Sequence, residues 1–193
     1  HERSSAASDV YKRQNYLFAP NSRNVFWETY GFNPQKTLVI IDEAHNLPER
    51  TADALSFQLS SKSWEYIIEN TLLSEGKMTL YNIGSEILAF LKKLKEKELL
   101  SATDTYLFLD LMDDFSSELK ETHIDSDSIN RNEINKLYEI PQIAEKLKND
   151  KENYLLWSPQ KEHLTISCID PSDWISNCLK PFASSIHLSL IHI

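Results

Sequence analysis

The sequence predicts an α/β protein in which a mainly helical segment interrupts a parallel sheet. An unbroken apolar run at 38–41 ends in an acidic pair. Helical periodicity dominates from about residue 63 to 150, and strand-like patterns return after Asn153. Because the apolar run contains no polar position, we expect a strand that is covered by helices on both faces, as in a parallel sheet.

Helical periodicity defines the middle of the chain. One helix is expected to bury the face formed by Leu80, Ile83, Ile87, Phe90, Leu91 and Leu94. The charged run KKLKEKE that follows is typical of a solvated helix face. A second helix is expected to begin near Thr103 or Asp104 and to bury Phe108, Met112, Phe115 and Leu119.

Two further helices are expected at about 131–140 and 141–150. They are separated by Pro141, because proline is favoured at a first helical position. The polar stretch 121–133 is the best candidate for a flexible loop.

The last third of the chain returns to strand patterns. Residues 153–170 predict two strands around a polar turn, and residues 170–182 predict a short capped helix. A final strand is expected to begin at SSIHL. We predict that the strands at 38–42 and 185–188 are parallel neighbours, since parallel strands need a long crossover between them.

The two ends of the chain are related at the level of codons. Residues 4–14, SSAASDVYKRQ, back-translate into a transposase sequencing adapter, and residues 188–193, LSLIHI, into the reverse complement of the codons for DVYKRQ. We therefore interpret residues 1–14 and 188–193 as adapter-derived and exclude them from fold reasoning. The alternative is that DVYKRQ is a native basic segment and LSLIHI a native strand. The natural segment, about 15–187, is expected to be an internal fragment of a longer open reading frame.

Composition narrows the function classes. Hydrophobic residues make up 41% of the chain and charged residues 25%, and no apolar run reaches the length of a membrane span. The formal charge of −9 disfavours a nucleic-acid-binding surface in this piece by itself, because phosphate contacts need clustered Lys and Arg. Cys168 and Cys178 are too few for a disulfide framework or a four-ligand metal site, and we expect small buried side chains in a reducing cytoplasm.

The candidate site lies in residues 37–50, TLVIIDEAHNLPER. In open α/β sheets ligands bind beyond the carboxyl ends of the strands, where Asp42 and Glu43 are expected. A carboxylate at a strand tip can hold Mg²⁺ through water, the role we assign to Asp42. A second carboxylate can orient an attacking water, which suits Glu43. The alternative interpretation is a capped helix start, where acidic residues favour the positive helix end.

The pattern lacks a phosphate-binding loop. ATP-splitting motors usually carry G-x-x-x-x-G-K-[ST] upstream of such a box, but the only glycines are Gly31, Gly76 and Gly84. We therefore predict that this chain alone has no ATPase activity.

Three stretches carry a resemblance to a known family. VIIDEAHNL resembles the Walker B segment of the XPD/DinG-type DNA helicases of superfamily 2, in which Asn and Leu commonly follow the Asp-Glu-Ala-His tetrad. NYLFAP at 15–20 is similar to the stretch that these proteins carry shortly before the box. SSIHLS looks like the strand that leads into their Ser-Ala-Thr motif.

The resemblance implies a partial RecA-like motor domain at 15–55 and 153–187, interrupted at 56–152 by a helical Arch-like insertion. It also implies ATP and Mg²⁺ as cofactors and single-stranded DNA as the partner of the full-length protein. His45 would couple the nucleotide state to neighbouring parts of the motor. A 4Fe-4S cluster is common in the family, but its cysteines would lie upstream of residue 15.

Two other functions remain open. A DEAH-type RNA helicase would carry the same tetrad, but its Ser-Ala-Thr motif should follow the box much sooner. The second alternative is a non-catalytic helical interaction module with a degenerate box. Recovery of the upstream gene would distinguish this module from a helicase by showing whether the phosphate loop exists.

Several further patterns invite a functional interpretation that we do not favour. Ser101-Ala102-Thr103 follows a charged helix rather than a buried strand, so helix capping explains it better. Four aromatic residues could stack on bases, but core packing or hairpin edges explain them better: Trp64, Tyr66, Trp157 and Trp174. Four aspartates are expected in solvated turns or helix faces: Asp113, Asp114, Asp125 and Asp127.

Overall fold

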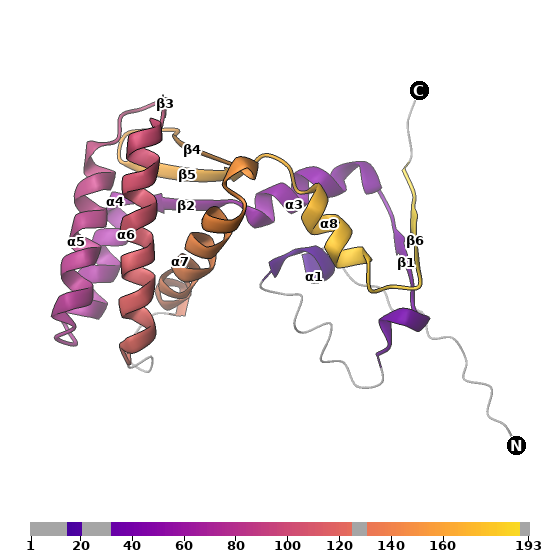
Figure 1. Cartoon of the computed structure of the whole chain (residues 1–193), viewed down its shortest axis with the longest axis horizontal. Coiled ribbons are helices and arrows are strands. Elements are labelled where there is room, and N and C mark those ends of the chain that lie inside the picture. Colours follow the sequence, from indigo (N-terminus) through magenta and orange to yellow (C-terminus); the bar gives the residue numbers. More distant parts are fainter. Residues whose placement is uncertain (1–14, 21–31, 125–130, 190–193) are drawn as a thin grey trace, which may run out of the picture. The chain divides into compact units, whose positions relative to one another are not determined.

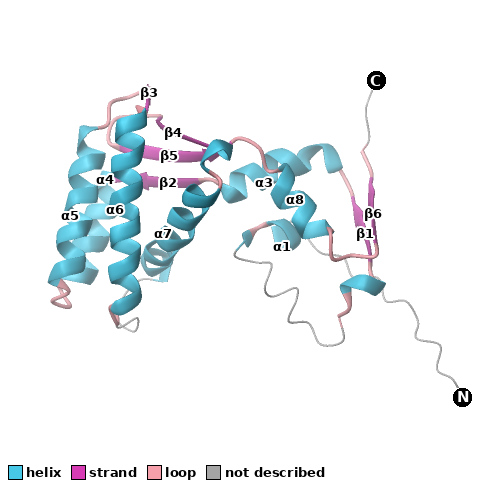
Figure 2. Ribbon diagram, in the orientation of Figure 1, coloured by secondary structure: helices cyan, strands magenta, loops and turns pink. Residues whose placement is uncertain are grey.

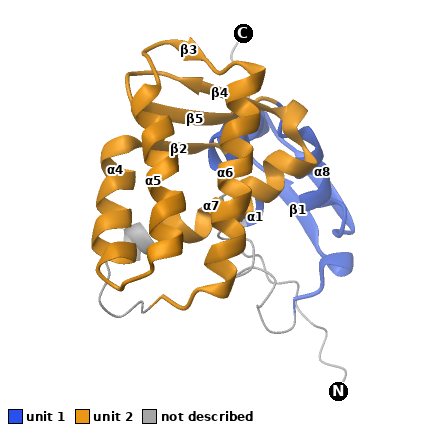
Figure 3. Cartoon of the chain, turned by 60° about the vertical axis from the view of Figure 1, so that its left-hand side comes forward, with its two compact units in different colours: residues 1–55, 170–193 blue, residues 56–169 orange. Residues whose placement is uncertain are grey.

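The structure, a computed structural model, describes residues 15–20, 32–124 and 131–189 (Figure 1). The chain divides into two compact units (Figure 3). Unit 1 comprises residues 1–55 and 170–193, and unit 2 comprises residues 56–169. Because unit 1 is built from both ends of the chain, unit 2 is an insertion within it.

Unit 1 contains a parallel pair of strands, β1 (Leu38–Ile41) and β6 (Ser184–His187) (Figure 2). Leu38 lies opposite Ser184 and Ile41 lies opposite His187. This pairing confirms that the strands before and after the helical block are parallel neighbours. The connection between them contains the whole of unit 2 as well as α3 and α8 of unit 1.

Within the described residues, unit 1 also contains the helices α1 (Asn15–Phe18), α3 (Leu47–Leu55) and α8 (Ser172–Leu179). Short 3-10 turns, η1 (Pro34–Lys36) and η2 (Ala44–Asn46), flank β1. Among the described residues, the buried cluster of unit 1 consists of Leu17, Phe18, Ile41, Leu47, Cys178 and Phe182. The indole Nε1 of Trp174 donates a hydrogen bond to the carbonyl oxygen of Phe18 at 2.6 Å and so joins α8 to α1.

The expectation that β1 is covered on both faces is wrong for this chain. Ile41 is buried and Val39 packs against the core, but Leu38 is 51% exposed and Ile40 59%. Successive side chains of a strand point to opposite faces, so one face of β1 is covered and the other is open. Ile186 of β6 is exposed as well. The apolar run therefore forms a strand with two apolar faces. The described helices of unit 1 cover only one of these faces.

Unit 2 contains an antiparallel sheet with the strand order β2-β5-β4-β3. The strands are β2 (Phe57–Ser60), β3 (Glu98–Leu99), β4 (Tyr154–Ser158) and β5 (His163–Cys168). The predicted hairpin is present as β4 and β5. The sequence pattern places residues 153–187 with unit 1, whereas the hairpin pairs with β2 and β3, and unit 2 extends to Ile169.

Helices cover the inner face of this sheet (Figure 3). They are α4 (Ser61–Ile67), the π-helical segment η3 (Ile68–Leu73), α5 (Met78–Lys93), α6 (Ala102–Glu121) and α7 (Arg131–Asn149), followed by the turn η5 (Lys151–Asn153). The predicted apolar faces of α5 and α6 are buried in a core shared with Leu59, Leu156 and Leu164 of the sheet. Ser101 caps α6, since its Oγ accepts a hydrogen bond from the amide of Asp104.

The helix α7 differs from the two helices that Pro141 suggested. It runs without interruption from Arg131 to Asn149 and contains the proline. Apolar residues on both sides of the proline share one buried face: Leu137, Ile140, Ile143, Ala144 and Leu147. Burial of this face outweighs the hydrogen bond that proline removes from the helix. Of the predicted loop 121–133, residues 125–130 lie outside the described residues, and the first residue and the last three belong to α6 and α7.

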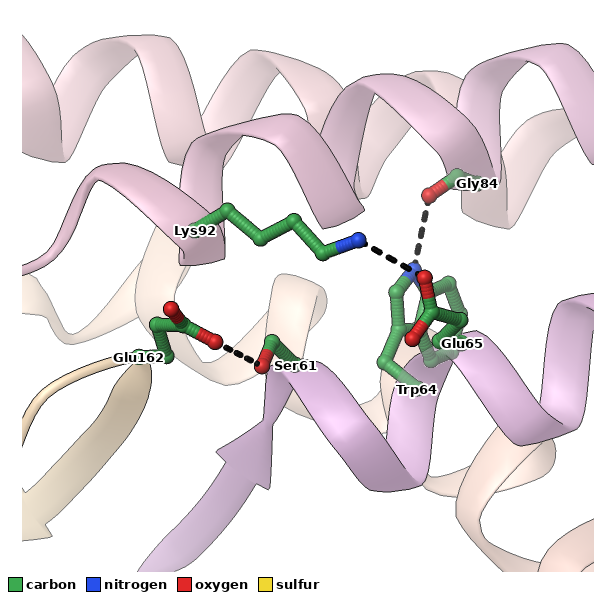
Figure 4. A network of polar contacts seen from close by, with 6 residues as sticks. All are labelled: Ser61, Trp64, Glu65, Gly84, Lys92 and Glu162. Atoms are coloured by element: carbon green, nitrogen blue, oxygen red, sulfur yellow. Dashed lines mark hydrogen bonds and ion pairs between the residues drawn. The ribbon is translucent and has the colours of Figure 1, made fainter.

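Specific polar contacts fix α4 within unit 2 (Figure 4). The indole Nε1 of Trp64 donates to the carbonyl oxygen of Gly84 in α5 at 2.7 Å. Lys92 Nζ and Glu65 Oε1 are 2.7 Å apart. At the start of α4, Ser61 Oγ donates to Glu162 Oε2 at 2.8 Å. These contacts link α4 to α5 and to the turn before β5.

Candidate functional site

The candidate site begins where β1 ends, in unit 1. Asp42 and Glu43 form the turn that leads from Ile41 into η2 and then α3. Glu43 adopts a left-handed backbone with φ 50° and ψ 45°. This conformation is uncommon outside glycine, and such residues cluster at functional sites. The turn therefore holds the second carboxylate in a conformation that the surrounding structure imposes.

The structure brings the three predicted site residues together. Asp42 Oδ1 accepts a hydrogen bond from the amide of Glu43 at 3.0 Å. Glu43 Oε2 lies 3.2 Å from Nδ1 of His45. The side chains of His45 and Glu43 are 50% and 42% exposed, and Asp42 is exposed. Two carboxylates and one imidazole thus stand at the open carboxyl end of a strand.

The chain after β6 approaches the same turn. The Leu188 amide donates to the carbonyl oxygen of Ile41, and the Ala44 amide donates to that of Leu188, each at 2.8 Å. Ser189 Oγ lies 3.0 Å from Nδ1 of His45. Because residues 188–193 are interpreted as adapter-derived, these contacts define the path of the chain rather than a native partner of His45. Sequence reasoning did not identify this approach, although the predicted pairing of the two strands implies it.

The donor set at the turn fits a magnesium ion that is held mainly by a nucleotide and water. Mg²⁺ usually takes one or two carboxylates and completes its shell with phosphate oxygens and waters. Asp42 offers an exposed carboxylate for such an ion. Within the described ranges, no group of three or more His, Cys, Asp or Glu residues could hold a metal by itself. Cys168 and Cys178 are both buried, as predicted, and they belong to different units.

The described glycines do not form a phosphate loop. Gly76 lies in the turn after η3, with φ +70°, and Gly84 lies inside α5. Gly31 lies outside the described residues. In the part of the chain that the structure describes, the box therefore has no glycine-rich partner.

The other residues considered from the sequence have separate structural positions. Trp64 is fully buried, Trp157 and Trp174 are half-buried, and Tyr66 is 51% exposed, so core packing does not account for Tyr66. Asp113 pairs with Lys148 on the surface, and Asp125 and Asp127 lie outside the described residues. None of the described helices is long and apolar enough to cross a membrane.

Comparisons with known proteins found a matching family model and matching solved structures. The DEAD_2 family model matches residues 3–64, a range that contains the box and also the N-terminal stretch that we interpret as adapter-derived. A solved structure described as "XPD_Helicase" matches with a TM-score of 0.51 at 18% identity over 91% of this chain. Another, "Truncated XPD", matches with a TM-score of 0.50 at 16% identity over 93% of this chain. At these identities the matches show a shared fold, and this chain has the fold of the matched part of the XPD structures.

This chain spans only part of the length of the structures that it matches. The chain spans 30% of the XPD_Helicase structure and 50% of the truncated XPD structure. A comparison with curated proteins found no match. Both structure matches cover more than nine tenths of this chain, which contains the parallel strand pair and the insertion between its strands.

Proposed function

We propose that this chain belongs to an ATP-dependent DNA helicase and carries the paired carboxylates of its ATPase site. The observation that carries the proposal is the position of Asp42 and Glu43, directly beyond the carboxyl end of a strand that pairs in parallel with β6. Ligands of open α/β sheets bind at this position. The similarity to XPD-type structures supports the same assignment.

The two carboxylates are assigned different tasks. Asp42 would hold Mg²⁺, which neutralises charge on the β- and γ-phosphates of ATP when it is bound. Glu43 would orient the attacking water and accept its proton. The Glu43 amide donates to Asp42 Oδ1 and so orients the Asp42 carboxylate, whereas the Glu43 carboxylate contacts His45. The motor domain would comprise unit 1, and unit 2 would be its Arch-like insertion.

The role proposed for His45 is to couple the nucleotide state to neighbouring parts of the motor. Its Nδ1 lies 3.2 Å from Glu43 Oε2. A change in the position of Glu43 on nucleotide binding would therefore act on His45 directly. Single-stranded DNA is the proposed partner of the full-length protein, and translocation coupled to duplex unwinding is the proposed activity.

The first test uses the chain as it is. We expect no Mg²⁺-dependent ATP hydrolysis above background, because the sequence has no G-x-x-x-x-G-K-[ST] loop to position the nucleotide, and positioning supplies much of the rate of phosphoryl transfer. The measurement is phosphate release with and without Mg²⁺, with Asp42→Asn as the matched control. Turnover that is lost in Asp42→Asn would contradict this prediction and reveal a phosphate site within the chain.

A further inference from the structure

A groove in unit 2 lies between the second half of α5 and the first half of α6. Its volume is about 370 Å³, and its apolar lining consists of Ala89, Phe90, Leu94, Leu100, Leu107 and Leu111. Phe90, Leu94 and Leu111 are at most 8% exposed, whereas Leu107 is 49% exposed. Phe90 is held by a tilted ring contact with the buried Phe108 at 5.3 Å. A fixed apolar floor beside an exposed leucine can receive an apolar side chain from a partner.

Carboxylates surround this floor. Glu86, Glu98 and Asp104 line the groove, together with Lys93 and Lys95. Asp104 Oδ2 accepts from Ser101 Oγ at 2.6 Å, and Glu98 Oε2 accepts from the Lys95 amide at 3.1 Å. The chain therefore holds Asp104 and Glu98 in place, and all three carboxylates retain acceptor capacity. In the described part of the chain, none of the three forms an ion pair.

The acidic character extends along α6 and over the whole unit. Asp104, Leu107, Leu111 and Asp114 are spaced 3, 4 and 3 residues apart, which puts them on one helix face. Asp104 and Asp114 therefore lie on either side of Leu107 and Leu111 along this face. Unit 2 carries 13 Lys and Arg against 20 Asp and Glu, a net charge of −7, while unit 1 accounts for the remaining −2 of the total. The charge of the chain is concentrated in the insertion.

We infer that this groove binds a basic amphipathic helix of a partner protein. Apolar side chains at helical spacing would occupy the floor beside Leu107, and flanking lysines or arginines would pair with Glu86, Asp104 and Asp114. Helices commonly dock in this way into apolar grooves between helices. A nucleic acid is the less suitable occupant, because its phosphates would meet these carboxylates. The inference rests on unit 2 alone and holds whether or not the ATPase assignment is correct.

The test is a fluorescence anisotropy titration of the full 193-residue chain. The probe is a labelled helical peptide with leucines at i, i+3 and i+7 and lysines on the flanks, and the control peptide has the same residues in scrambled order. We expect saturable binding of the probe that weakens as salt is added. Leu107→Lys and Glu86→Lys should each weaken binding by about tenfold or more.

A matched control separates the groove from the general acidity of unit 2. Glu69→Lys makes the same charge change as Glu86→Lys at an exposed position of η3, which does not line the groove. This variant should keep the affinity of the unchanged chain. Glu86 and Leu107 are both exposed to solvent, and circular dichroism of each variant confirms that its fold is retained.

Four results would overturn the inference. The first two are a scrambled peptide that binds as tightly as the probe, and a Glu69→Lys variant that weakens binding as much as Glu86→Lys. The third is a single-stranded oligonucleotide that displaces the probe and loses affinity in Leu107→Lys, which would make the groove a nucleic-acid site. The fourth is self-association of the chain that Leu107→Lys abolishes, while the probe does not bind.

Discussion

Unit 1 and unit 2 differ in how completely they bury their apolar side chains. Among the described residues, the core of unit 2 joins four helices, a π-helical segment and the inner face of a four-stranded sheet, whereas the buried cluster of unit 1 has six residues. In unit 1, Leu38 and Ile40 of β1 and Ile186 of β6 remain exposed on one sheet face. Buried apolar area is the main favourable term in folding, so unit 2 should be the more stable unit. The unit with the candidate site is thus the one with less packing to hold it.

The largest effect should come from the two tryptophans that donate their indole Nε1–H to a backbone carbonyl. Trp64 is fully buried in unit 2 and makes an edge-to-face contact with Phe115 at 5.2 Å, whereas Trp174 in unit 1 is half-buried. Trp64→Ala should destabilise unit 2 by about 3–5 kcal/mol, because it removes a large side chain from a closed core. Trp174→Ala should cost unit 1 less.

Hydrogen exchange measured by mass spectrometry distinguishes the two units, since amides of each report their own opening. Trp64→Ala should lower protection in unit 2, and Trp174→Ala should do so in unit 1. Equal losses in both units from either substitution would mean that the two cores unfold as one, and would break the comparison.

A smaller effect is expected from two glycines of unit 2 that are constrained in different ways. A Cβ added to Gly84 would lie 2.9 Å from Ile68 Cγ2 and 3.5 Å from Phe115 Cε2. Gly84→Ala should therefore destabilise by about 1–2 kcal/mol through overpacking, despite the better helix propensity of alanine. Gly76 has open space around it but a φ of +70°, so Gly76→Ala should cost about 1 kcal/mol through its backbone alone.

A double-mutant cycle in denaturant unfolding tests this distinction. Ile68→Ala removes the atom that Gly84→Ala would strike, so the two substitutions should couple, while Gly76→Ala and Ile68→Ala should be additive. A neutral or stabilising Gly84→Ala would show that the packing of unit 2 is looser than the structure implies.

The smallest effect concerns pH and the contact between Ser61 and Glu162. The hydrogen bond that Ser61 donates holds the pKa of Glu162 below its usual range, the positive charges of Lys161 and Lys92 act in the same direction, and partial desolvation opposes them. A carboxyl group with a lowered folded pKa stabilises the protein above its unfolded pKa, and this contribution is lost as the pH falls through the folded value.

Ser61→Ala should therefore reduce the stability of unit 2 at neutral pH, and the difference from the unchanged chain should shrink on acidification below about pH 4. Thermal unfolding of both proteins from neutral pH to below about pH 4 measures this difference in stability. A difference that grows on acidification would have the wrong sign for this contact.

The sequence predicted the elements whose periodicity is unambiguous. The apolar run of β1, the amphipathic faces of α5 and α6 and the alternation of β4 and β5 each carry their own signal. The acidic pair after β1 also located the candidate site. Its left-handed Glu43 left no signal, because glutamate is not a residue type that marks such a conformation.

The elements that the sequence did not predict depend on partners that are distant in the chain. β2 has four residues and β3 two, and each is stabilised by pairing with the hairpin rather than by a pattern of its own. We predicted that the insertion ends at residue 152, whereas unit 2, which contains the hairpin, ends at Ile169. We also predicted a helix boundary at Pro141. In the structure α7 continues past this proline, because the face that contains Ile140 and Ala144 is buried.

The most direct test of the proposed function compares two substitutions in the full-length protein, with single-stranded DNA present. Nucleotide affinity and single-turnover hydrolysis are measured for Glu43→Gln and Asp42→Asn. Glu43→Gln should still bind ATP with Mg²⁺, but hydrolysis should fall by at least about a hundredfold, roughly 3 kcal/mol of transition-state stabilisation. Asp42→Asn should weaken Mg²⁺-dependent binding as well as turnover, because it removes the charge that faces the ion. If Glu43→Gln hydrolyses ATP at the rate of the unchanged protein, the box is only the start of α3 and the helicase proposal loses its chemical support.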